Sequence, residues 1–258
     1  MKIIRYSTSR RKPGYGWLLE DKVGPIKGDL FGAYQRGEAR IALDKVQLLP
    51  PVVPSKIICV ARNYAAHAAE HGAPVPEVPV LFLKPPSALI GHGDPILIPP
   101  QAERVEHEAE LAVVVGKAGR WIDPAQACDH ILGYTIANDV TDRVFQREDL
   151  LWTRAKGFDS FCPIGPWIET DLNTADAIIT CRVNGELRQM TSTREMVFLI
   201  EQLIAFASSF MTLVPGDLLL TGTPEGVGVL TPGDTVEVEI EGIGTLSNPV
   251  IQDEREDL

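Results

Sequence analysis

The sequence predicts a mostly β fold of the α+β type, and three observations support this. Short apolar segments bounded by Gly and Pro recur along the whole chain of 258 residues, as expected for strands joined by turns. The segment TVEVEIEG (235–242) alternates between apolar and acidic residues, as a half-buried strand does. Only one long segment, 193–211, has apolar residues at helical spacing. Strands are therefore expected to outnumber helices.

The first part of the chain predicts a small β-rich domain over residues 1–53. Two strand-like segments, KIIRYS and WLLE, flank the turn-rich segment RRKPGYG (10–16). The proline-rich segment LLPPVVPSK (48–56) follows, and proline both disrupts central strands and stiffens linkers. We therefore predict a boundary there, with a second and larger domain over residues 54–258.

The second domain is predicted to begin with a buried strand, KIICVA, and a short helix in NYAAHAAEHG (63–72). Asn63 is a candidate N-cap for this helix, and Gly72 is a candidate stop. Apolar strands broken by Pro and Gly come next, in VPVLFLKPPSALIG and DPILIPP. The one long helix, at 193–211, is predicted to be structural, with a possible capping box of Ser192 and Glu195.

Composition excludes several functional classes. The longest apolar runs are far shorter than the ~20 residues of a membrane helix, and the start lacks the features of a signal peptide, so a cytoplasmic location is expected. The four cysteines form no CxxC pair, which argues against a disulfide framework or a thiolate zinc site. The net charge of -11 disfavours nucleic acid and membrane surfaces as partners. The final segment, DEREDL (253–258), is expected to be a solvated tail.

Three glutamates alternate along one predicted strand, EHEAELAVVV (106–115). Because successive side chains of a strand point to opposite faces, Glu106, Glu108 and Glu110 should share one face. The other face should carry Ala109, Leu111, Val113 and Val115. They could simply face water on an edge strand. However, the next strand ends at Asp139, and clustered carboxylates resist ionisation unless a cation joins them. Oxygen ligands without His or Cys suit Mg2+, Mn2+ or Ca2+, so the pattern predicts a metal site.

Other polar residues could serve catalysis or substrate binding. His67 and Glu70 are three residues apart on the short helix, so the carboxylate can orient the imidazole as a base. The segment 142–161 adds cations and an amide that could bind a carboxylate, and TGTPEGVG offers Thr223 but lacks the ending of a phosphate-binding loop. Each could also be an ordinary surface group. Arg188 and Gln189 could meet a second carboxylate of the substrate.

Five segments, in this order, resemble the fumarylacetoacetate hydrolase family: ARNYAAHAAEHG, VEHEAELAVVVGK, GYTIANDVTDRVFQ, RAKGFDSFCPIGPW and LLLTGTPEGVG. The resemblance covers roughly residues 55–250. It implies a rolled, mixed β-sheet with few helices, usually in a homodimer. It also implies a bound Mg2+ or Mn2+, with Ca2+ as a substitute, and a small 2-oxo or 1,3-diketo acid as the substrate.

The resemblance also implies roles for individual residues. Glu106 falls outside the family's paired metal ligands. His67 and Glu70 match a water-activating pair on a mobile lid helix, and Lys156 matches the lysine near the metal. The remaining matches are metal ligands at Glu108, Glu110 and Asp139, and substrate-binding residues at Arg143, Gln146, Thr223 and, more weakly, Arg62.

The reaction predicted from these residues is hydrolysis of a C–C bond in an acylpyruvate or another 1,3-diketo acid, through a metal-stabilised enolate. The same enolate allows alternatives in the catabolism of aromatic compounds. These are isomerisation of 2-hydroxyhepta-2,4-diene-1,7-dioate and decarboxylation of a 2-oxo acid such as oxaloacetate. A rival of another class is a metal-stabilised binding protein without turnover.

Overall fold

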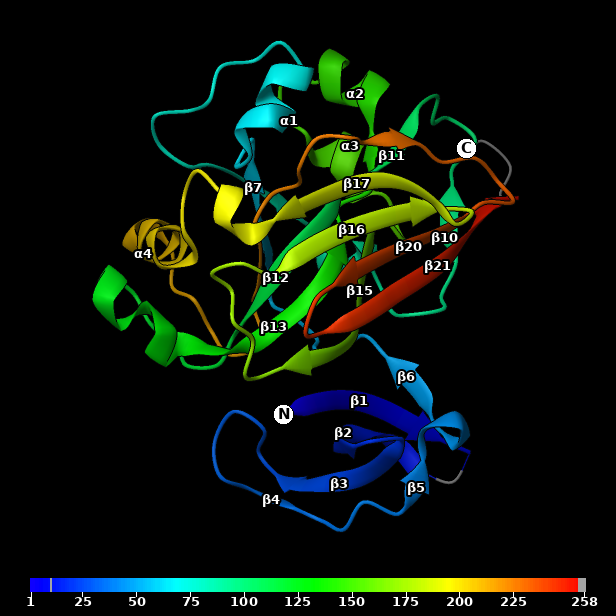
Figure 1. Cartoon of the computed structure of the whole chain (residues 1–258), viewed down its shortest axis with the longest axis vertical. Helices are drawn as coiled ribbons and strands as arrows, with labels where there is room; N and C mark the ends of the chain where they lie inside the picture. Colours follow the sequence, from blue (N-terminus) through cyan, green and yellow to red (C-terminus); the bar gives the residue numbers. More distant parts are fainter. Residues whose placement is uncertain (10, 255–258) are drawn as a thin grey trace.

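A computed structural model describes residues 1–9 and 11–254 of the chain (Figure 1). Strands dominate the described residues, and both parallel and antiparallel pairs occur, so the predicted mostly β, mixed-sheet fold is confirmed. Most of the acidic tail, 255–258, lies outside the described residues. Its first residue, Asp253, donates its backbone N–H to the carbonyl of Ile98.

The N-terminal unit is β-rich, as predicted. Its strands are β1 (Lys2–Thr8), β2 (Arg11–Leu19), β3 (Lys22–Gly28), β4 (Tyr34–Arg36), β5 (Ile41–Ala42) and β6 (Gln47–Leu49), with a 3-10 turn η1 (Leu43–Lys45). The prediction of a turn over 10–16 is wrong for 11–16, because these residues begin β2 and pair with β1. Glycine makes this pairing possible, since a Cβ at Gly16 would lie 2.8 Å from the ring of Tyr6.

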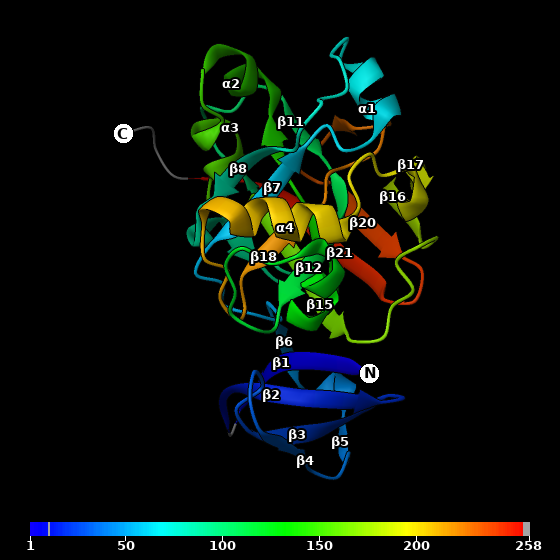
Figure 2. The same cartoon turned by 90° about the vertical axis from the view of Figure 1, so that its left-hand side faces the viewer.

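The N-terminal unit lies at one end of the molecule and is joined to the remainder by a strand pair (Figures 1 and 2). In that pair, β1 runs antiparallel to β15 (Cys162–Glu169), with Lys2 opposite Glu169. The terminal ammonium of Met1 also forms an ion pair with Glu169. The sheet is therefore continuous across both units, and the division at residues 53 and 54 stays a prediction.

The larger unit contains the central part of the main sheet, in the order β15-β13-β12-β18-β7-β8. Within this part, only β18 and β7 pair in parallel. The bounds are β7 (Ile57–Ala61), β8 (Val80–Lys84), β12 (Ala109–Val115), β13 (Ile131–Asn138) and β18 (Leu218–Leu220), with β9 (Leu89–Ile90) beside β15.

Two smaller sheets complete the β structure. The first has the order β10-β21-β20-β16-β17, and the second has the order β14-β11-β19. Their bounds are β10 (Ile96–Ile98), β11 (Val105–His107), β14 (Thr141–Asp142), β16 (Ile178–Val183), β17 (Glu186–Ser192), β19 (Gly228–Val229), β20 (Thr235–Ile240) and β21 (Gly244–Gln252).

The main hydrophobic core lies against one face of β12, and a second core lies against its other face. As predicted, Ala109, Leu111, Val113 and Val115 share a face, where they pack in one cluster with apolar residues of β16, β20 and β21. The alternate residues Ala112 and Val114 belong to the second cluster. Because both faces are covered, the strand is apolar at every position after Glu110.

The described residues contain four α-helices, α1 (Ala65–Glu70), α2 (Arg143–Glu148), α3 (Thr153–Gly157) and α4 (Ile200–Phe210), and three further 3-10 segments, η2 (Pro86–Ala88), η3 (Pro124–His130) and η4 (Thr193–Glu195). The prediction of one long helix at 193–211 is wrong for residues 193–199, where the chain turns at η4 and becomes extended before α4. No helix among these residues is long and apolar enough to cross a membrane.

Asn63 explains both the interruption before α4 and the position of α1. Its side chain accepts a hydrogen bond from Phe198 N–H at 2.7 Å and donates to the carbonyls of Phe198 at 3.1 Å and Thr221 at 2.8 Å. It is therefore not the predicted N-cap, and α1 begins after Tyr64 without a side-chain cap. Nor do Ser192 and Glu195 form a capping box for α4. Ser192 Oγ accepts from Arg194 N–H, and the N–H of Leu199, just before α4, binds Gln202.

Replacing Asn63 with Ala should destabilise the fold by about 1–3 kcal/mol, because buried backbone groups lose their partners. Urea unfolding would measure this difference. Asn173, which is exposed, provides the matched control, and its replacement with Ala should cost no more than about 0.5 kcal/mol. Equal effects of the two substitutions would contradict the bridging role of Asn63.

Candidate active site

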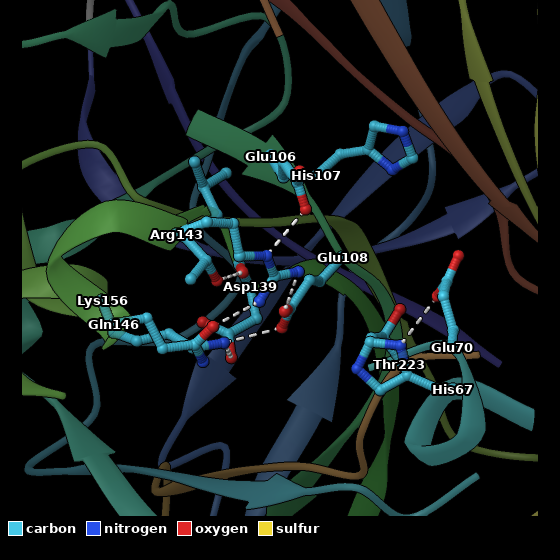
Figure 3. Close-up of polar contacts among 12 residues, drawn as sticks. His67, Glu70, Glu106, His107, Glu108, Asp139, Arg143, Gln146, Lys156 and Thr223 are labelled. Carbon is cyan, nitrogen blue, oxygen red and sulfur yellow. Dashed lines mark hydrogen bonds and ion pairs between the residues drawn. The ribbon is translucent and has the colours of Figure 1, made fainter. Parts of the chain in front are cut away.

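One cavity of about 440 Å³ collects nearly all of the residues singled out from the sequence. Its lining residues come from the end of β7, the start of β12, the residue after β13 and the short helices α1, α2 and α3. Figure 1 shows these three helices at the end of the molecule opposite the N-terminal unit, and Figure 3 shows the side chains. Nine of the ten predicted site residues line the cavity, namely Arg62, His67, Glu108, Glu110, Asp139, Arg143, Gln146, Lys156 and Thr223. The tenth, Glu70, is not among the lining residues but contacts Nδ1 of His67.

The three predicted metal ligands converge on one point of the cavity. Glu108, Glu110 and Asp139 are all buried, and one carboxylate oxygen from each lies within 4.8 Å of the others. Strand pairing explains this arrangement, because β12 and β13 are antiparallel neighbours with Ala109 opposite Asn138. Glu106 is also buried. The alternative of glutamates on a water-facing edge strand is therefore wrong.

Two buried lysines offset part of this negative charge. Lys156 Nζ donates to two of the predicted metal ligands, Glu108 at 2.7 Å and Asp139 at 2.6 Å. Lys84 Nζ donates to the other oxygen of Asp139 at 2.6 Å and to the carbonyl of Val140 at 3.2 Å. Lys84 is not among the residues predicted from the sequence. Its position at the end of an apolar strand was the available signal, because a buried lysine requires an anionic partner.

The carboxylates differ in how well they are compensated. Burial raises the pKa of Glu108, but the charges of Lys156 and Arg143 outweigh burial and hold this pKa below its ordinary value. Burial also raises the pKa of Glu110, and the charges of Asp139 and Glu108 raise it further, well above the ordinary value. Glu110 is therefore the least compensated carboxylate of the set.

This set of residues fits a divalent cation. Glu110 accepts a hydrogen bond from Gly222 N–H at 2.7 Å, but no Lys or Arg in the described part of the chain forms an ion pair with it. A dication would supply the missing positive charge. The three ligands offer only oxygen atoms, which is the chemistry that Mg2+, Mn2+ and Ca2+ prefer.

Arg143 is held against the acidic set by Glu106. Its Nε donates to Glu106 at 2.7 Å, its Nη1 donates to Gln146 at 2.8 Å, and its Nη2 lies 2.7 Å from Glu108. Glu106 also accepts from Arg104 at 2.7 Å. Glu106, which falls outside the family's paired metal ligands, thus orients Arg143, a predicted substrate-binding residue.

His67 and Glu70 form the predicted pair on α1. The imidazole Nδ1 lies 3.4 Å from one oxygen of Glu70, while the other oxygen accepts from Gly226 N–H at 3.1 Å. Burial lowers the pKa of His67, so the neutral imidazole is favoured. With Nδ1–H directed to Glu70, the Nε2 lone pair is available on the cavity side. Figure 3 shows this ring across the cavity from Glu108.

Gln189 forms a hydrogen bond with Thr223 but does not itself line the cavity. Its oxygen accepts from Ala109 N–H at 3.1 Å and lies 3.0 Å from His107 Nδ1, and its amide nitrogen donates to Thr223 Oγ1 at 2.9 Å. Thr223 therefore uses its oxygen as an acceptor there and can donate its own hydrogen into the cavity. The expectation that Gln189 meets the substrate is wrong.

The expectation for Arg188 is also wrong. Its side chain is exposed and forms an ion pair with Glu186 at 2.7 Å, and it does not line the cavity. Arg188 and Gln189 are neighbours on β17, so their side chains must point to opposite faces. The sequence could therefore have shown that at most one of them meets the substrate.

Comparison with known protein families identifies the class. Residues 56–251 match the family model described as "Fumarylacetoacetate (FAA) hydrolase C-terminal", and residues 1–51 match the model "Rv2993c-like, N-terminal". The chain therefore belongs to the fumarylacetoacetate hydrolase family. Members of this family are enzymes that bind a divalent metal, in agreement with the acidic set at Glu108, Glu110 and Asp139.

Three proteins that are similar to this chain illustrate the reactions of its relatives. It is 46% identical over 220 residues to the mitochondrial oxaloacetate tautomerase FAHD2B of Bos taurus, covering 80% of this chain and 70% of the relative. The structure of 2-hydroxyhepta-2,4-diene-1,7-dioate isomerase from Mycobacterium marinum matches with a TM-score of 0.92 and 40% identity, over 99% and 100% of the two chains. Maleylpyruvate hydrolase from Sphingobium sp. SYK-6, in complex with manganese(II) and pyruvate, matches with a TM-score of 0.81 and 31% identity, over 98% and 100%.

Replacing Glu110 with Gln should separate metal binding from folding. Without metal, the variant should melt at or above the wild-type temperature, because an uncompensated buried carboxylate is removed and Gln can still accept from Gly222. Saturating Mn2+ should stabilise the wild type, by about 2.7 kcal/mol at 100 times Kd, and stabilise the variant far less. Thermal melting with EDTA or Mn2+ tests this. Glu239→Gln, on an exposed strand position, should respond to Mn2+ like the wild type.

Proposed function

We propose that this enzyme hydrolyses a C–C bond of an acylpyruvate or a similar 1,3-diketo acid, with Mg2+ or Mn2+ as cofactor. The observation that carries the proposal is the His67–Glu70 pair, which lies across one cavity from the three carboxylates. A base that can take a proton from water and a site for a cation are the two components that such a hydrolysis requires.

The substrate would be held at its pyruvate end. A divalent ion bound by Glu108, Glu110 and Asp139 would polarise the 2-oxo group and offset negative charge that develops on its oxygen. Thr223 can donate its hydroxyl hydrogen to the substrate carboxylate. Arg62 also lines the cavity, and its buried Nε has no hydrogen-bond partner in the described structure, so it can bind the same carboxylate.

The bond would be broken by water acting on the more distant carbonyl. His67 Nε2 takes a proton from water, while Glu70 stabilises the imidazolium that forms. The hydroxide adds to the distant carbonyl, and the C–C bond then breaks with its electron pair remaining on the pyruvate fragment. Lys156, together with Arg143, offsets negative charge on the reacting oxygens. Arg104 and Arg147 also line the cavity and could bind a second carboxylate of a diacid.

A second candidate function is movement of a proton without cleavage. The similarity to an oxaloacetate tautomerase at 46% identity and to a dienedioate isomerase at 40% favours it. The same His67 could carry a proton between carbon and oxygen if no carbonyl lies within reach of the activated water. Decarboxylation of oxaloacetate would use the same charge stabilisation and remains a third possibility for this site.

Further features of the proposal rest on the sequence and the family. The manganese(II) in the maleylpyruvate hydrolase structure supports Mn2+ beside Mg2+. The relatives that act on dienedioates and maleylpyruvate support a place in the catabolism of aromatic compounds. A homodimer in the cytoplasm, acting on small molecules without nucleic-acid or membrane partners, stays a prediction.

The proposal is tested by turnover of the purified protein with Mg2+ on acetylpyruvate, fumarylpyruvate and oxaloacetate. We expect EDTA-sensitive release of pyruvate from an acylpyruvate. His67→Ala should lower kcat by about 10²–10⁴ because the general base is lost, while Mn2+ affinity stays close to the wild-type value. Hydrolysis at wild-type rate in His67→Ala would contradict the assigned base. Enol–keto conversion of oxaloacetate without cleavage of any acylpyruvate would favour the second candidate.

The pH profile should report the state of His67. Catalysis requires the neutral imidazole, so kcat/KM should fall as the pH drops through the pKa of His67, which burial holds below its ordinary value. The hydrogen bond that His67 donates to Glu70 raises this pKa. Glu70→Gln should therefore move the acidic limb to lower pH and also lower the maximal rate. A limb that moves to higher pH would contradict the pairing.

A further inference from the structure

The geometry points to a second cation site on α1, formed by His67, Glu70 and His71, which binds Zn2+ or a similar transition-metal ion and switches off the base. One ligand atom from each of these residues lies within 4.8 Å of the others. The set is separate from the acidic set, with which it shares no residue. That an ion here inhibits the enzyme rests on the proposed function; that an ion binds here does not.

The local sequence places the three groups on one helix face. His67 and His71 are four residues apart, and Glu70 is three residues from His67, so all three side chains lie on adjacent rows. The helical turn continues to His71, whose N–H donates to the carbonyl of His67 at 3.3 Å. The order His-x-x-Glu-His also occurs on the zinc-binding helix of inverzincin enzymes, which shows that one helix can present two imidazoles at this spacing to zinc.

The distances are close to those of a tetrahedral zinc site. Bonds of about 2.0–2.1 Å in tetrahedral geometry separate neighbouring ligand atoms by about 3.3 Å. His67 Nδ1 and Glu70 Oε2 are already 3.4 Å apart. The rings of His67 and His71 meet edge to face, with centroids 4.7 Å apart. Because His71 is exposed, rotation of its side chain can bring its nitrogen to the ion, and water or substrate can fill the fourth position.

The surroundings favour the same ion. Glu70 keeps its second oxygen bound to Gly226 N–H at 3.1 Å, which orients the carboxylate and leaves Oε2 available. Glu70 and His71 are exposed, so an ion can reach the site from solvent. Two imidazoles and one carboxylate suit Zn2+ better than Mg2+, whereas the oxygen-only acidic set suits Mg2+. The two sites therefore differ in metal preference.

Occupation of this site removes the base for a simple chemical reason. A neutral imidazole has one proton and one lone pair. If a cation occupies Nδ1 of His67, the proton resides on Nε2, the nitrogen on the cavity side. Nε2 can then no longer accept a proton from water, and Glu70 is no longer available to stabilise an imidazolium. Zn2+ would therefore inhibit turnover without displacing Mg2+ from the acidic set.

Stoichiometry measured by calorimetry tests the site independently of turnover. Zn2+ is titrated into the full chain with Mg2+ in large excess, and wild type and Glu110→Gln should each bind one tight equivalent. His71→Ala and His71→Gln should bind it more than about tenfold more weakly, since loss of a ligand costs at least as much as loss of an outer-shell partner. His130→Ala, which changes a histidine on η3, is the matched control and should bind as the wild type does.

Inhibition is then measured with the same proteins. Zn2+ should inhibit the wild type and His130→Ala, while His71→Ala, measured relative to its own rate with Mg2+ alone, should need at least about tenfold more Zn2+. Unchanged Zn2+ binding in both His71 variants, or loss of the tight equivalent in Glu110→Gln, would overturn the proposal. If no acylpyruvate is turned over, the proposed function fails, yet the titration still decides whether the site exists.

Discussion

The structure depends on the compensation of carboxylates that are buried at the ends of two neighbouring strands. Glu108, Glu110 and Asp139 would repel one another and destabilise the fold if nothing balanced them. Lys156 forms ion pairs with two of the three, and Lys84 with one. Glu110 alone lacks such a partner among the described residues. The two lysines therefore neutralise only part of the charge of the three carboxylates, and a bound cation can neutralise the remainder.

The strand pairing and the charge compensation constrain each other. The antiparallel register of β12 and β13 fixes the backbone, and Asp139 N–H donates to the carbonyl of Glu108 at 2.9 Å. The lysines arrive from distant elements, at the end of β8 and on α3. A helix of only five residues such as α3 has little stability alone, so the ion pairs of Lys156 also help to hold it.

The sequence predicted what is local and missed what is assembled at long range. The face shared by Ala109, Leu111, Val113 and Val115 follows from alternation along one strand, and the metal-ligand set follows from motif matching. The strand could have indicated that Lys84 is buried, but its partner Asp139 could not be identified, because it is 55 residues away. Helical spacing at 193–211 likewise did not reveal that Asn63 binds the backbone of Phe198 and keeps that part extended.

In the proposed mechanism, charge stabilisation and proton transfer are carried out by separate parts of the structure. The acidic set lies at the packed ends of the central sheet. His67 instead belongs to a six-residue helix, with Asn63 bound to the Thr221 carbonyl just before it and Glu70 bound to Gly226 N–H at its last residue. The charged part is common to hydrolysis, tautomerisation and decarboxylation, because each places negative charge on the same substrate oxygen. Under the proposed mechanism, the outcome depends on what His67 can reach, and so on the position of α1. We therefore expect changes in that short helix, rather than in the buried carboxylates, to alter which reaction the site carries out.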